Sequence, residues 1–199
     1  MLFDEDNHQY DGYQSVSEFL SKFKKEFPKN LIAEKMAAKG DLTKEEILYK
    51  WDLNGKISCD YGKSCHGAIE YFIKFGEKPK LHTKLVNEFA KKYDRKELVS
   101  EIIAYNDDLK IAGTLDIVRK LGNKEVDIID LKTNAEMTKD KIAEYELQLT
   151  TYKWLLEQKG LKVKNLILEH WTNKLKTIKL KTNKKLWQNL QSLQMESVS

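Results

Sequence analysis

The chain has 199 residues, of which 41% are hydrophobic and 33% are charged, as expected of a globular domain with a well-solvated surface. No stretch approaches the roughly 18 consecutive apolar residues that span a bilayer, which excludes a transmembrane helix. The formal net charge of +4 does not by itself indicate a nucleic-acid partner. We expect a single domain over residues 1–199, with a helical part at 1–80 and a sheet core at 97–182.

The cysteines and the N-terminus bear on the cellular compartment. Cys59 and Cys65 are the only cysteines, and their spacing matches neither a metal site nor a redox motif. We expect both to be packing residues of a protein in a reducing compartment. The acidic N-terminal run MLFDEDNHQYDGY lacks the apolar core of a signal peptide. The sequence therefore predicts a cytoplasmic protein without a membrane partner.

The N-terminal part is predicted to be helical. Apolar residues at helical spacing predict helices over 15–27, a short stretch ending at Gly40, 43–51, 56–75 and 83–93. Two of these starts match a capping box, Ser15 with Glu18 and Thr43 with Glu46. Gly55 is expected to break or kink the chain between the third and the fourth helix.

From residue 97 the apolar pattern changes to the period of a strand. Runs rich in Ile, Val and Leu predict strands over 98–105, 110–120, 124–132, 163–171 and 176–180. Thr138 is expected to cap a long helix over 139–159, which Gly160 ends, and a polar helix surrounds Trp187. This order of elements predicts a mixed α/β fold, a central mixed sheet with helices on its faces.

Lysines gather near the C-terminus. The segment from Lys159 to Lys185 holds nine lysines and one acidic residue, Glu169. Two interpretations remain open, a solvated face of an ordinary domain and an electrostatic footprint for phosphate groups.

The predicted hairpin over 110–132 carries the residues of greatest chemical interest. Asp130 and Lys132 lie two apart on one strand, so their side chains share a face of the sheet. Whether Asp116 joins them depends on the turn that begins at Gly122. A two-residue turn would place Asp116 on the other face, whereas a three-residue turn would place it directly across from Asp130.

The cross-strand pairs of the hairpin favour the three-residue turn. In that register Arg119 lies opposite Asp127, and Ile117 lies opposite Ile129. Opposite charges then lie across from each other, and apolar side chains lie across from apolar side chains, as cross-strand energetics favour. We therefore expect Asp116 and Asp130 to face each other.

The preceding hairpin adds a further acid to this face. An even-numbered loop at 106–109 would pair Glu101 with Thr114, and Gly113 beside them indicates a close approach of another element. One surface would then carry Glu101, Thr114, Asp116, Asp130 and Lys132. Three acids gathered on a half-buried face repel one another and need a cation. The alternative is an ordinary solvent-exposed sheet face.

Two helical pairs complete the candidates. His66 and Glu70 are four apart on one helix, as are Gln148 and Tyr152 on another, so each pair shares a helix face. The simplest interpretations are a surface His–Glu pair and a packing pair with a buried hydrogen bond. They become functional only if both helices pack across the hairpin.

Taken in order, these residues resemble the RecB-like branch of the PD-(D/E)XK nuclease superfamily. The matching elements, over residues 60–155, are the helix GKSCHGAIE, the strands GTLD and DLK, and the helical run QLTTY. The opening YQSVSEFL, with Trp51, looks like phage-type exonucleases and the mitochondrial genome maintenance exonuclease. The resemblance implies a restriction-endonuclease-like core with an N-terminal helical region.

The resemblance also implies a metal site. Asp116 and Asp130 would bind Mg²⁺ or Mn²⁺, with His66 and the backbone carbonyl of Leu131 as further ligands. Imidazole is an uncommon ligand of Mg²⁺, so with His66 in the set we expect Mn²⁺ to serve as well as Mg²⁺ or better. The family members with an iron–sulfur cluster use four cysteines, so no such cluster is expected here.

The remaining roles follow from the same resemblance. Lys132 would act with Asp116 and Asp130 in catalysis, by positioning or helping to deprotonate the attacking water. Gln148 and Tyr152 would contact the DNA backbone or brace the lysine. Glu101 matches an acidic residue whose role in the family is less defined.

The implied function is a metal-dependent DNA exonuclease that hydrolyses phosphodiester bonds from DNA ends. Its setting would be phage or mobile-element recombination, replication or repair in the cytoplasm of a bacterial or phage-infected cell. The chain has no helicase motif, so a helicase or a single-strand-annealing protein is an expected partner. The alternative is a protein that binds DNA ends or a partner on a nuclease fold without cutting. Polarity, strand preference and oligomeric state stay open.

Overall fold

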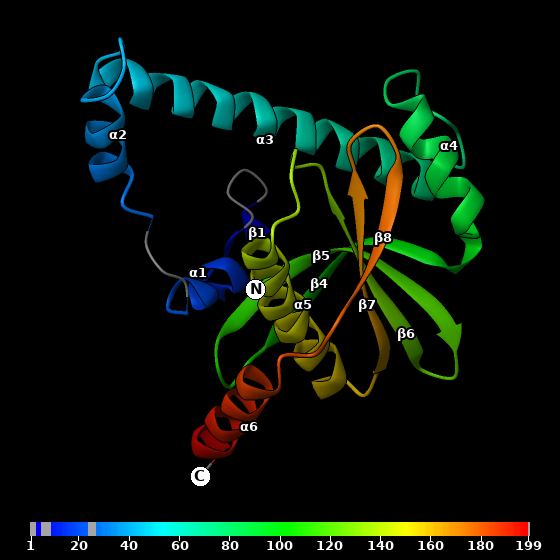
Figure 1. Cartoon of the computed structure of the whole chain (residues 1–199). Coiled ribbons are helices and arrows are strands. Elements are labelled where there is room, and N and C mark those ends of the chain that lie inside the picture. Colours follow the sequence, from blue (N-terminus) through cyan, green and yellow to red (C-terminus); the bar gives the residue numbers. More distant parts are fainter. Residues whose placement is uncertain (1–2, 5–8, 24–26, 199) are drawn as a thin grey trace.

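The computed structural model describes residues 3–4, 9–23 and 27–198. In chain order the elements are β1 (Phe3–Asp4), β2 (Gln9–Tyr10), β3 (Gln14–Ser15), α1 (Val16–Ser21), α2 (Lys29–Ala37), α3 (Lys44–Phe75), α4 (Thr83–Lys92), a 3-10 turn η1 (Arg95–Glu97), β4 (Leu98–Asn106), β5 (Ile111–Gly122), β6 (Glu125–Lys132), α5 (Lys139–Gln158), β7 (Lys162–Trp171), β8 (Leu175–Leu180) and α6 (Lys184–Val198) (Figure 1). The five predicted strands and the long helix after Thr138 are confirmed, whereas the short strands β1, β2 and β3 are not predicted.

The central sheet is mixed, as predicted. Its main path runs β3-β5-β6-β7-β8, and β4 pairs with β5. The pairs β4–β5, β5–β6 and β7–β8 are antiparallel, whereas β6 and β7 are parallel and connected through α5. A parallel connection requires a crossover, which α5 supplies. The fold is thus a mixed sheet flanked by helices, consistent with a restriction-endonuclease-like core.

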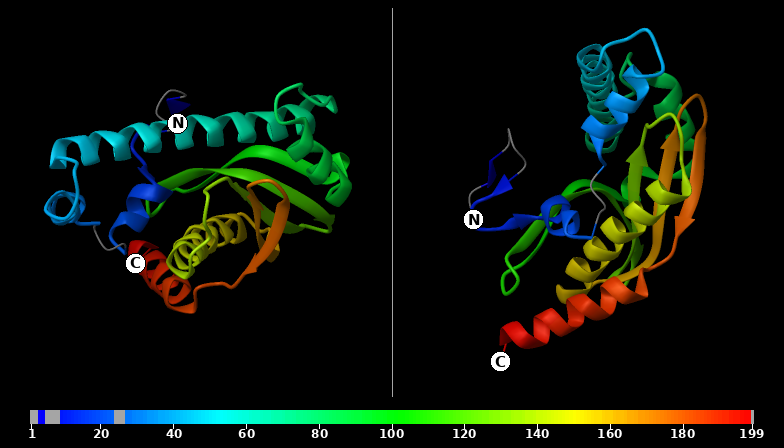
Figure 2. Two further views of the ribbon diagram at one scale, coloured as in Figure 1. Left: turned by 45° about the horizontal axis from the view of Figure 1, so that its top comes forward. Right: turned by 60° about the vertical axis from the view of Figure 1, so that its left-hand side comes forward.

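Helices cover both faces of the sheet. Figure 2 (left) shows the strands between α3 on one side and α5 with α6 on the other. Ile128 and Leu168 face α5, where Trp154 is fully buried, while Ile129 faces α3 and α4, where Phe89 is fully buried. The alternation of side chains along β6 therefore supplies two hydrophobic cores, one on each face.

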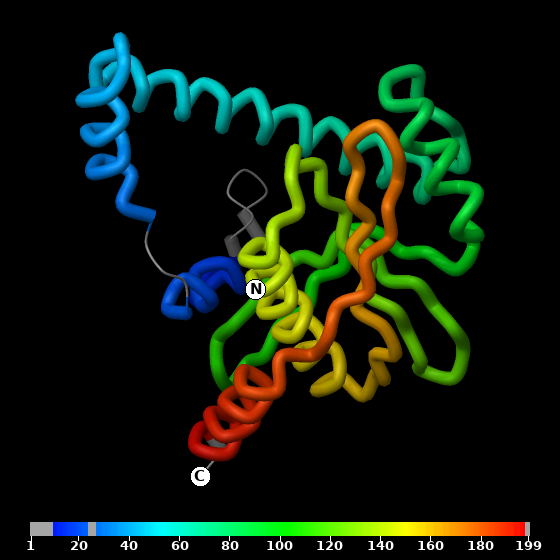
Figure 3. Tube along the Cα trace, in the orientation of Figure 1, coloured from blue at the N-terminus to red at the C-terminus, as the bar shows by residue number. Residues whose placement is uncertain are grey.

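Helix α3 is a single helix of 32 residues, so the prediction of two helices separated by a break at Gly55 is wrong. Figure 3 follows it as one unbroken coil. Glycine keeps its backbone N–H and costs only about 1 kcal/mol relative to alanine inside a helix. The predicted capping box of Thr43 and Glu46 is present, and Gly76 ends the helix in the left-handed conformation. Strong ends thus hold the helix together across Gly55.

Helix α1 is shorter than the helix predicted over 15–27. It ends at Ser21, although the Ser15 hydroxyl accepts a hydrogen bond from the Glu18 N–H, as expected at its start. Residues 24–26 lie outside the described residues. Helix α2 ends at Ala37, close to the predicted stop at Gly40.

The β5–β6 hairpin has the predicted register but reaches it by another route. Arg119 pairs with Asp127, and Ile117 pairs with Ile129. The predicted three-residue turn is wrong, because the turn holds only Asn123 and Lys124, both with positive φ as a tight hairpin turn requires. A bulge between Lys120 and Gly122 adds the residue that restores the register.

The β4–β5 hairpin is shifted by two residues from the prediction. Thr114 pairs with Ile103 rather than with Glu101. The Asn106 side chain accepts a hydrogen bond from the Leu109 N–H at 2.7 Å, so the turn begins only after Asn106. A shift by two residues keeps every side chain on its face, and Glu101 stays on the face of Asp116.

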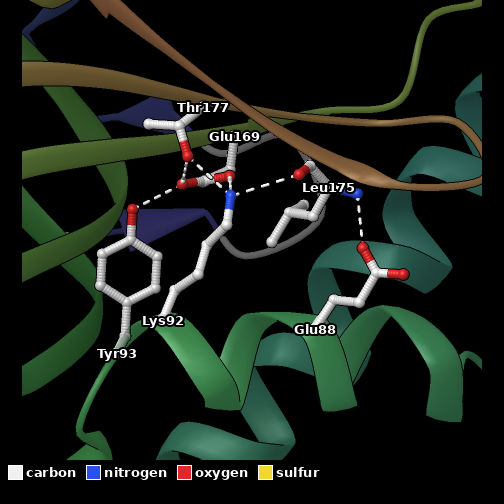
Figure 4. Close-up of polar contacts among 6 residues, drawn as sticks. All are labelled: Glu88, Lys92, Tyr93, Glu169, Leu175 and Thr177. Carbon is white, nitrogen blue, oxygen red and sulfur yellow. Dashed lines mark hydrogen bonds and ion pairs between the residues drawn. The ribbon is translucent and has the colours of Figure 1, made fainter.

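A buried ionic network fastens α4 to the β7–β8 hairpin (Figure 4). The Glu169 side chain is fully buried, and Lys92 Nζ lies 2.8 Å from its Oε2. Its Oε1 accepts hydrogen bonds from the hydroxyls of Tyr93, at 2.6 Å, and Thr177, at 2.7 Å. Burial and the Glu169 carboxylate raise the pKa of Tyr93, so this hydroxyl stays a donor. The one acid of the lysine-rich segment is therefore internal and neutralises none of its exposed lysines.

Two smaller expectations remain. Cys65 is buried as expected, but the prediction that Cys59 is a packing residue is wrong, since Cys59 is exposed on α3. Within the described ranges, no helix is both long and apolar enough to cross a membrane.

Candidate active site

A cleft of about 1580 Å³ opens between α3, the start of α1 and the sheet. The sheet contributes Glu101 and Asp116, and α3 contributes His66. The loop after Lys132 closes another side of the cleft. The predicted hairpin and the predicted histidine helix therefore meet at one cavity.

Asp116 lies on the side of the cleft that the sheet forms. Its Oδ2 accepts a hydrogen bond from the Leu131 N–H at 3.0 Å and lies 3.3 Å from His66 Nδ1. Burial opposes ionisation of Asp116, but the His66 side chain outweighs it and lowers the pKa of the carboxyl group. Burial likewise disfavours the imidazolium, yet the hydrogen bond and the charge of Asp116 raise the pKa of His66. The two groups stabilise each other in their charged forms.

Asp130 and Lys132 form an ion pair next to Asp116. Lys132 Nζ lies 2.8 Å from Asp130 Oδ2 and donates a hydrogen bond to Oδ1 at 3.1 Å. Asp130 is 5% exposed, and its buried Oδ2 accepts no hydrogen bond of good geometry. Burial raises the pKa of Asp130 to about 6, with a smaller contribution from Asp116. Burial opposes the charge of Lys132, but Asp130 and Asp116 outweigh it and raise the pKa of the ammonium group.

The carboxylates and the imidazole around Asp116 fit a divalent cation. Two carboxylates and one imidazole are ligands that Mg²⁺ and Mn²⁺ accept, and Asp130 Oδ2 accepts no hydrogen bond of good geometry. The N–H and C=O of one residue in an antiparallel strand point to the same side, so the Leu131 carbonyl faces β5 and Asp116 as well. Among the described residues, no three His, Cys, Asp or Glu side chains already surround one point as a metal cluster.

Glu101 has an unusual backbone. Its φ of 53° is left-handed, and the regular pairs Ser100–Ile117 and Ile102–Leu115 leave it opposite Asp116. This conformation is rare within a strand and marks a local irregularity beside the site. Glu101 is exposed and lines the cleft, so its predicted place in the acidic column holds although its predicted pairing does not.

The His66–Glu70 pair separates into two contacts. His66 turns to Asp116, whereas Glu70 forms an ion pair with Lys74 one helical turn further on. The surface His–Glu pair considered from the sequence is therefore absent, and His66 belongs to the cleft.

Tyr152 reaches the cleft from α5, and Gly113 makes room for it. A Cβ on Gly113 would lie 2.8 Å from the Tyr152 hydroxyl oxygen, which confirms the predicted close approach at this glycine. Burial, with Asp116 and Asp130, raises the pKa of Tyr152. Gln148 is half-buried and hydrogen-bonds to Tyr152, so its contact is with this hydroxyl rather than with Lys132.

Several residues around the cleft are not predicted from the sequence. The Lys132 ammonium lies 4.9 Å from the centre of the Tyr145 ring, and the Tyr145 hydroxyl donates to Asn134. In the sequence, Tyr145 lies three residues before Gln148, which places both on one face of α5 but does not link Tyr145 to Lys132. The lysines of the cleft wall are Lys63, Lys74, Lys132 and Lys141, all of them outside the lysine-rich C-terminal segment.

Comparison with protein families identifies the chain. A model of the PD-(D/E)XK nuclease superfamily matches residues 75–193. The chain belongs to this superfamily. The match includes Asp116, Asp130, Lys132 and the α5 pair but begins after His66. Membership indicates a nuclease with DNA as the substrate, and PD-(D/E)XK nucleases typically use divalent metals.

Other comparisons are more distant. No curated protein matches the chain. The solved structure of SSO0001 is 15% identical at a TM-score of 0.44, over 94% of this chain and 77% of that one. A protein from Eubacterium rectale, provisionally described as an exonuclease, is 14% identical at a TM-score of 0.46, over 98% of this chain and 84% of that one.

Proposed function

We propose that this PD-(D/E)XK protein is a Mg²⁺- or Mn²⁺-dependent DNA exonuclease of the RecB-like, phage-type branch. One observation carries the proposal. His66 from α3, Asp116 from β5 and Lys132 from β6 line one cleft, and the buried Asp130 pairs with Lys132, in the chain order of the branch that the sequence resembles. In this proposal residues 1–199 form one nuclease domain.

The metal would be held by Asp116, Asp130, the Leu131 carbonyl and His66. When bound, a divalent ion would lower the pKa of its bound water toward neutral pH and would offset charge on the scissile phosphate. Asp130 is buried and Asp116 is half-buried, and hydrogen bonds already hold both carboxylates, so they need little reorganisation to act as ligands.

Lys132 acts as a cation in this scheme. Asp130 and Asp116 raise the pKa of its ammonium group in the metal-free protein. In this scheme the group positions or helps to deprotonate the attacking water and offsets phosphate charge. Tyr152 lies at the cleft wall with a protonated hydroxyl, which donates to the DNA backbone, and Gln148 holds that hydroxyl in place.

The preference for DNA ends and the biological setting rest on the resemblance to phage-type exonucleases. We place the protein in recombination, replication or repair of phage or mobile-element DNA, in the cytoplasm of a bacterial or phage-infected cell. A helicase or a single-strand-annealing protein would supply the substrate ends.

The test is digestion of single- and double-stranded DNA labelled at either end, beside a closed circle, with Mg²⁺ or Mn²⁺. We expect mononucleotides or short products from linear DNA, an intact circle, and no product from Lys132→Ala. Cleavage of the circle would change the proposal to an endonuclease. Salt-sensitive DNA binding without any metal-dependent product would favour the non-cleaving alternative. Full activity of Lys132→Ala would reject the assigned site.

A further inference from the structure

Lys132 is held on two sides. Its side chain has four rotatable bonds, and fixing such a chain costs roughly 2 kcal/mol of conformational free energy. Asp130 holds the ammonium from one side at 2.8 Å. On the other side the ammonium lies 4.9 Å from the centre of the Tyr145 ring, within the range of a cation–π contact.

The two contacts differ in what competes for them. In the proposed function, Asp130 shares its carboxylate with a metal ion, which weakens its hold on the ammonium. No metal competes for the face of the Tyr145 ring. A cation–π contact that is partly shielded from water contributes about 1–2 kcal/mol. The ring is therefore the contact that keeps Lys132 in place when Asp130 binds a cation.

Tyr145 is itself braced from the sheet. Its hydroxyl donates to Asn134 Oδ1 at 3.3 Å. The carbonyl of Asn134 accepts a hydrogen bond from His170 Nε2 at 2.7 Å, and His170 is buried on β7 directly across from Lys132. The series of contacts thus begins at Lys132 on β6 and ends at His170, its neighbour on β7, and it passes through Asn134 in the loop after Lys132.

We propose that Tyr145 is the positioning residue for Lys132, and that His170 braces it through Asn134. Tyr145 is half-buried and lies behind the lysine rather than in the cleft wall, so it acts through Lys132 and does not touch the substrate. The proposal rests on the proposed function for its catalytic consequence, but its geometric part concerns the metal-free protein alone.

The geometric part is tested by NMR on metal-free protein with labelled lysine, with Lys132 assigned through Lys132→Arg. An ammonium over a ring face places the adjacent methylene protons in the shielding region, so the Lys132 Hε signal lies upfield of exposed lysines. We expect this shift to persist in Tyr145→Phe, which keeps the ring, and to disappear in Tyr145→Leu. A Lys132 signal at the position of exposed lysines in the unmodified protein overturns the proposal.

The catalytic part is tested by single-turnover cleavage of linear DNA beside DNA binding without metal. Loss of the ring contact should slow cleavage roughly tenfold in Tyr145→Leu, with the binding affinity for DNA unchanged. Tyr145→Phe keeps the ring but loses the hydrogen bond to Asn134, so it should slow cleavage only about twofold, and His170→Leu, which acts through the same hydrogen bond, should slow cleavage by no more than Tyr145→Phe does.

A matched control is Trp187→Leu, which removes another lysine–aromatic contact of α5, that of Lys153 at 5.3 Å. It should leave both the Lys132 signal and the cleavage rate unchanged. An equal loss of rate in Trp187→Leu and Tyr145→Leu, or no rescue by Tyr145→Phe, overturns the positioning role. An unmodified protein that binds DNA but does not cleave it defeats the proposed function, while the NMR outcome still stands on its own.

Discussion

Two lysine–carboxylate pairs lie on neighbouring strands of the sheet, on opposite faces, and they differ in how completely their oxygens are bonded. Glu169 on β7 accepts from Tyr93 and Thr177 and pairs with Lys92, all under a covering helix. Within the part of the chain that the structure describes, Asp130 on β6 forms its ion pair with Lys132, and one of its buried oxygens lacks a good hydrogen bond. We call Glu169 with Lys92 the closed pair, and Asp130 with Lys132, which borders the cleft through Lys132, the open pair.

The difference separates a structural role from a functional one. A buried charge is tolerated when donors surround it, and Glu169 meets that condition. Asp130 does not, and its raised pKa records the free-energy cost of keeping it ionised without a further cation. Buried ionisable groups with strongly shifted pKa values are characteristic of functional sites. The comparison therefore supports the proposed metal role of Asp130 and assigns Glu169 to the attachment of α4.

The largest effect is expected from Asp130→Asn, which keeps the shape of the side chain and removes its charge. Nuclease activity should fall by roughly 10²–10³-fold, because one electrostatic contact to the reacting centre is lost. The thermal midpoint of the metal-free protein should fall less than in Glu169→Gln, because the unfavourable buried charge of Asp130 is removed and Asp116 remains near the Lys132 ammonium. Activity assays with parallel thermal unfolding check both. A large loss of stability would place Asp130 in the same class as Glu169.

The reverse outcome is expected from Glu169→Gln. Lys92 then loses its ionic partner inside the protein, which destabilises a buried pair by 3–5 kcal/mol. The Lys92 side chain is 32% exposed, so we expect about 3 kcal/mol, near the lower end of that range. Urea denaturation measures this loss. Activity per folded molecule should stay within about twofold of the unmodified protein, a change worth less than 0.5 kcal/mol. A selective loss of activity would show that the two pairs are not independent.

His66→Gln tests whether the histidine belongs to the open pair. Removing the imidazole should weaken Mn²⁺ binding by roughly tenfold, as seen when groups around a metal site are changed. Mg²⁺ binding should weaken less, because Mg²⁺ prefers oxygen ligands. Calorimetric titration with both metals measures the difference. Equal, unchanged affinities would remove His66 from the proposed ligand set.

A smaller effect is expected from pH. Ligands bind metal only when deprotonated, and the pKa of Asp130 is raised to about 6 while that of His66 is raised as well. Protons therefore displace the metal as pH falls. The rise in thermal midpoint produced by Mn²⁺ should be largest above pH 7 and should fade toward pH 5. Asp130→Asn should show little rise at any pH. A rise that grows as the pH falls would contradict the site.

Much of this site follows from periodicity and chain order. Alternation along β6 places Asp130 and Lys132 on one face, and the pairing of Arg119 with Asp127 brings Asp116 beside them. Gly113 marks the position where Tyr152 approaches the sheet. These are local rules, so a single sequence is enough to apply them.

Other features depend on three-dimensional contacts that no local pattern specifies. The Asn106 side chain delays the turn before β5 and moves the register by two residues. Helix α3 continues through Gly55 because its capped ends outweigh one weak position. The contact of Tyr145 with Lys132 joins a helix to a strand, and the sequence spacing of these residues carries no sign of it.

The central claim, that the open pair is a metal site, is tested most directly by anomalous X-ray scattering from crystals soaked in Mn²⁺. The predicted result is a peak in the cleft, coordinated by oxygens of Asp116 and Asp130 and the Leu131 carbonyl, with His66 alongside. A cleft without a peak, or a peak bound to other residues, would contradict the account.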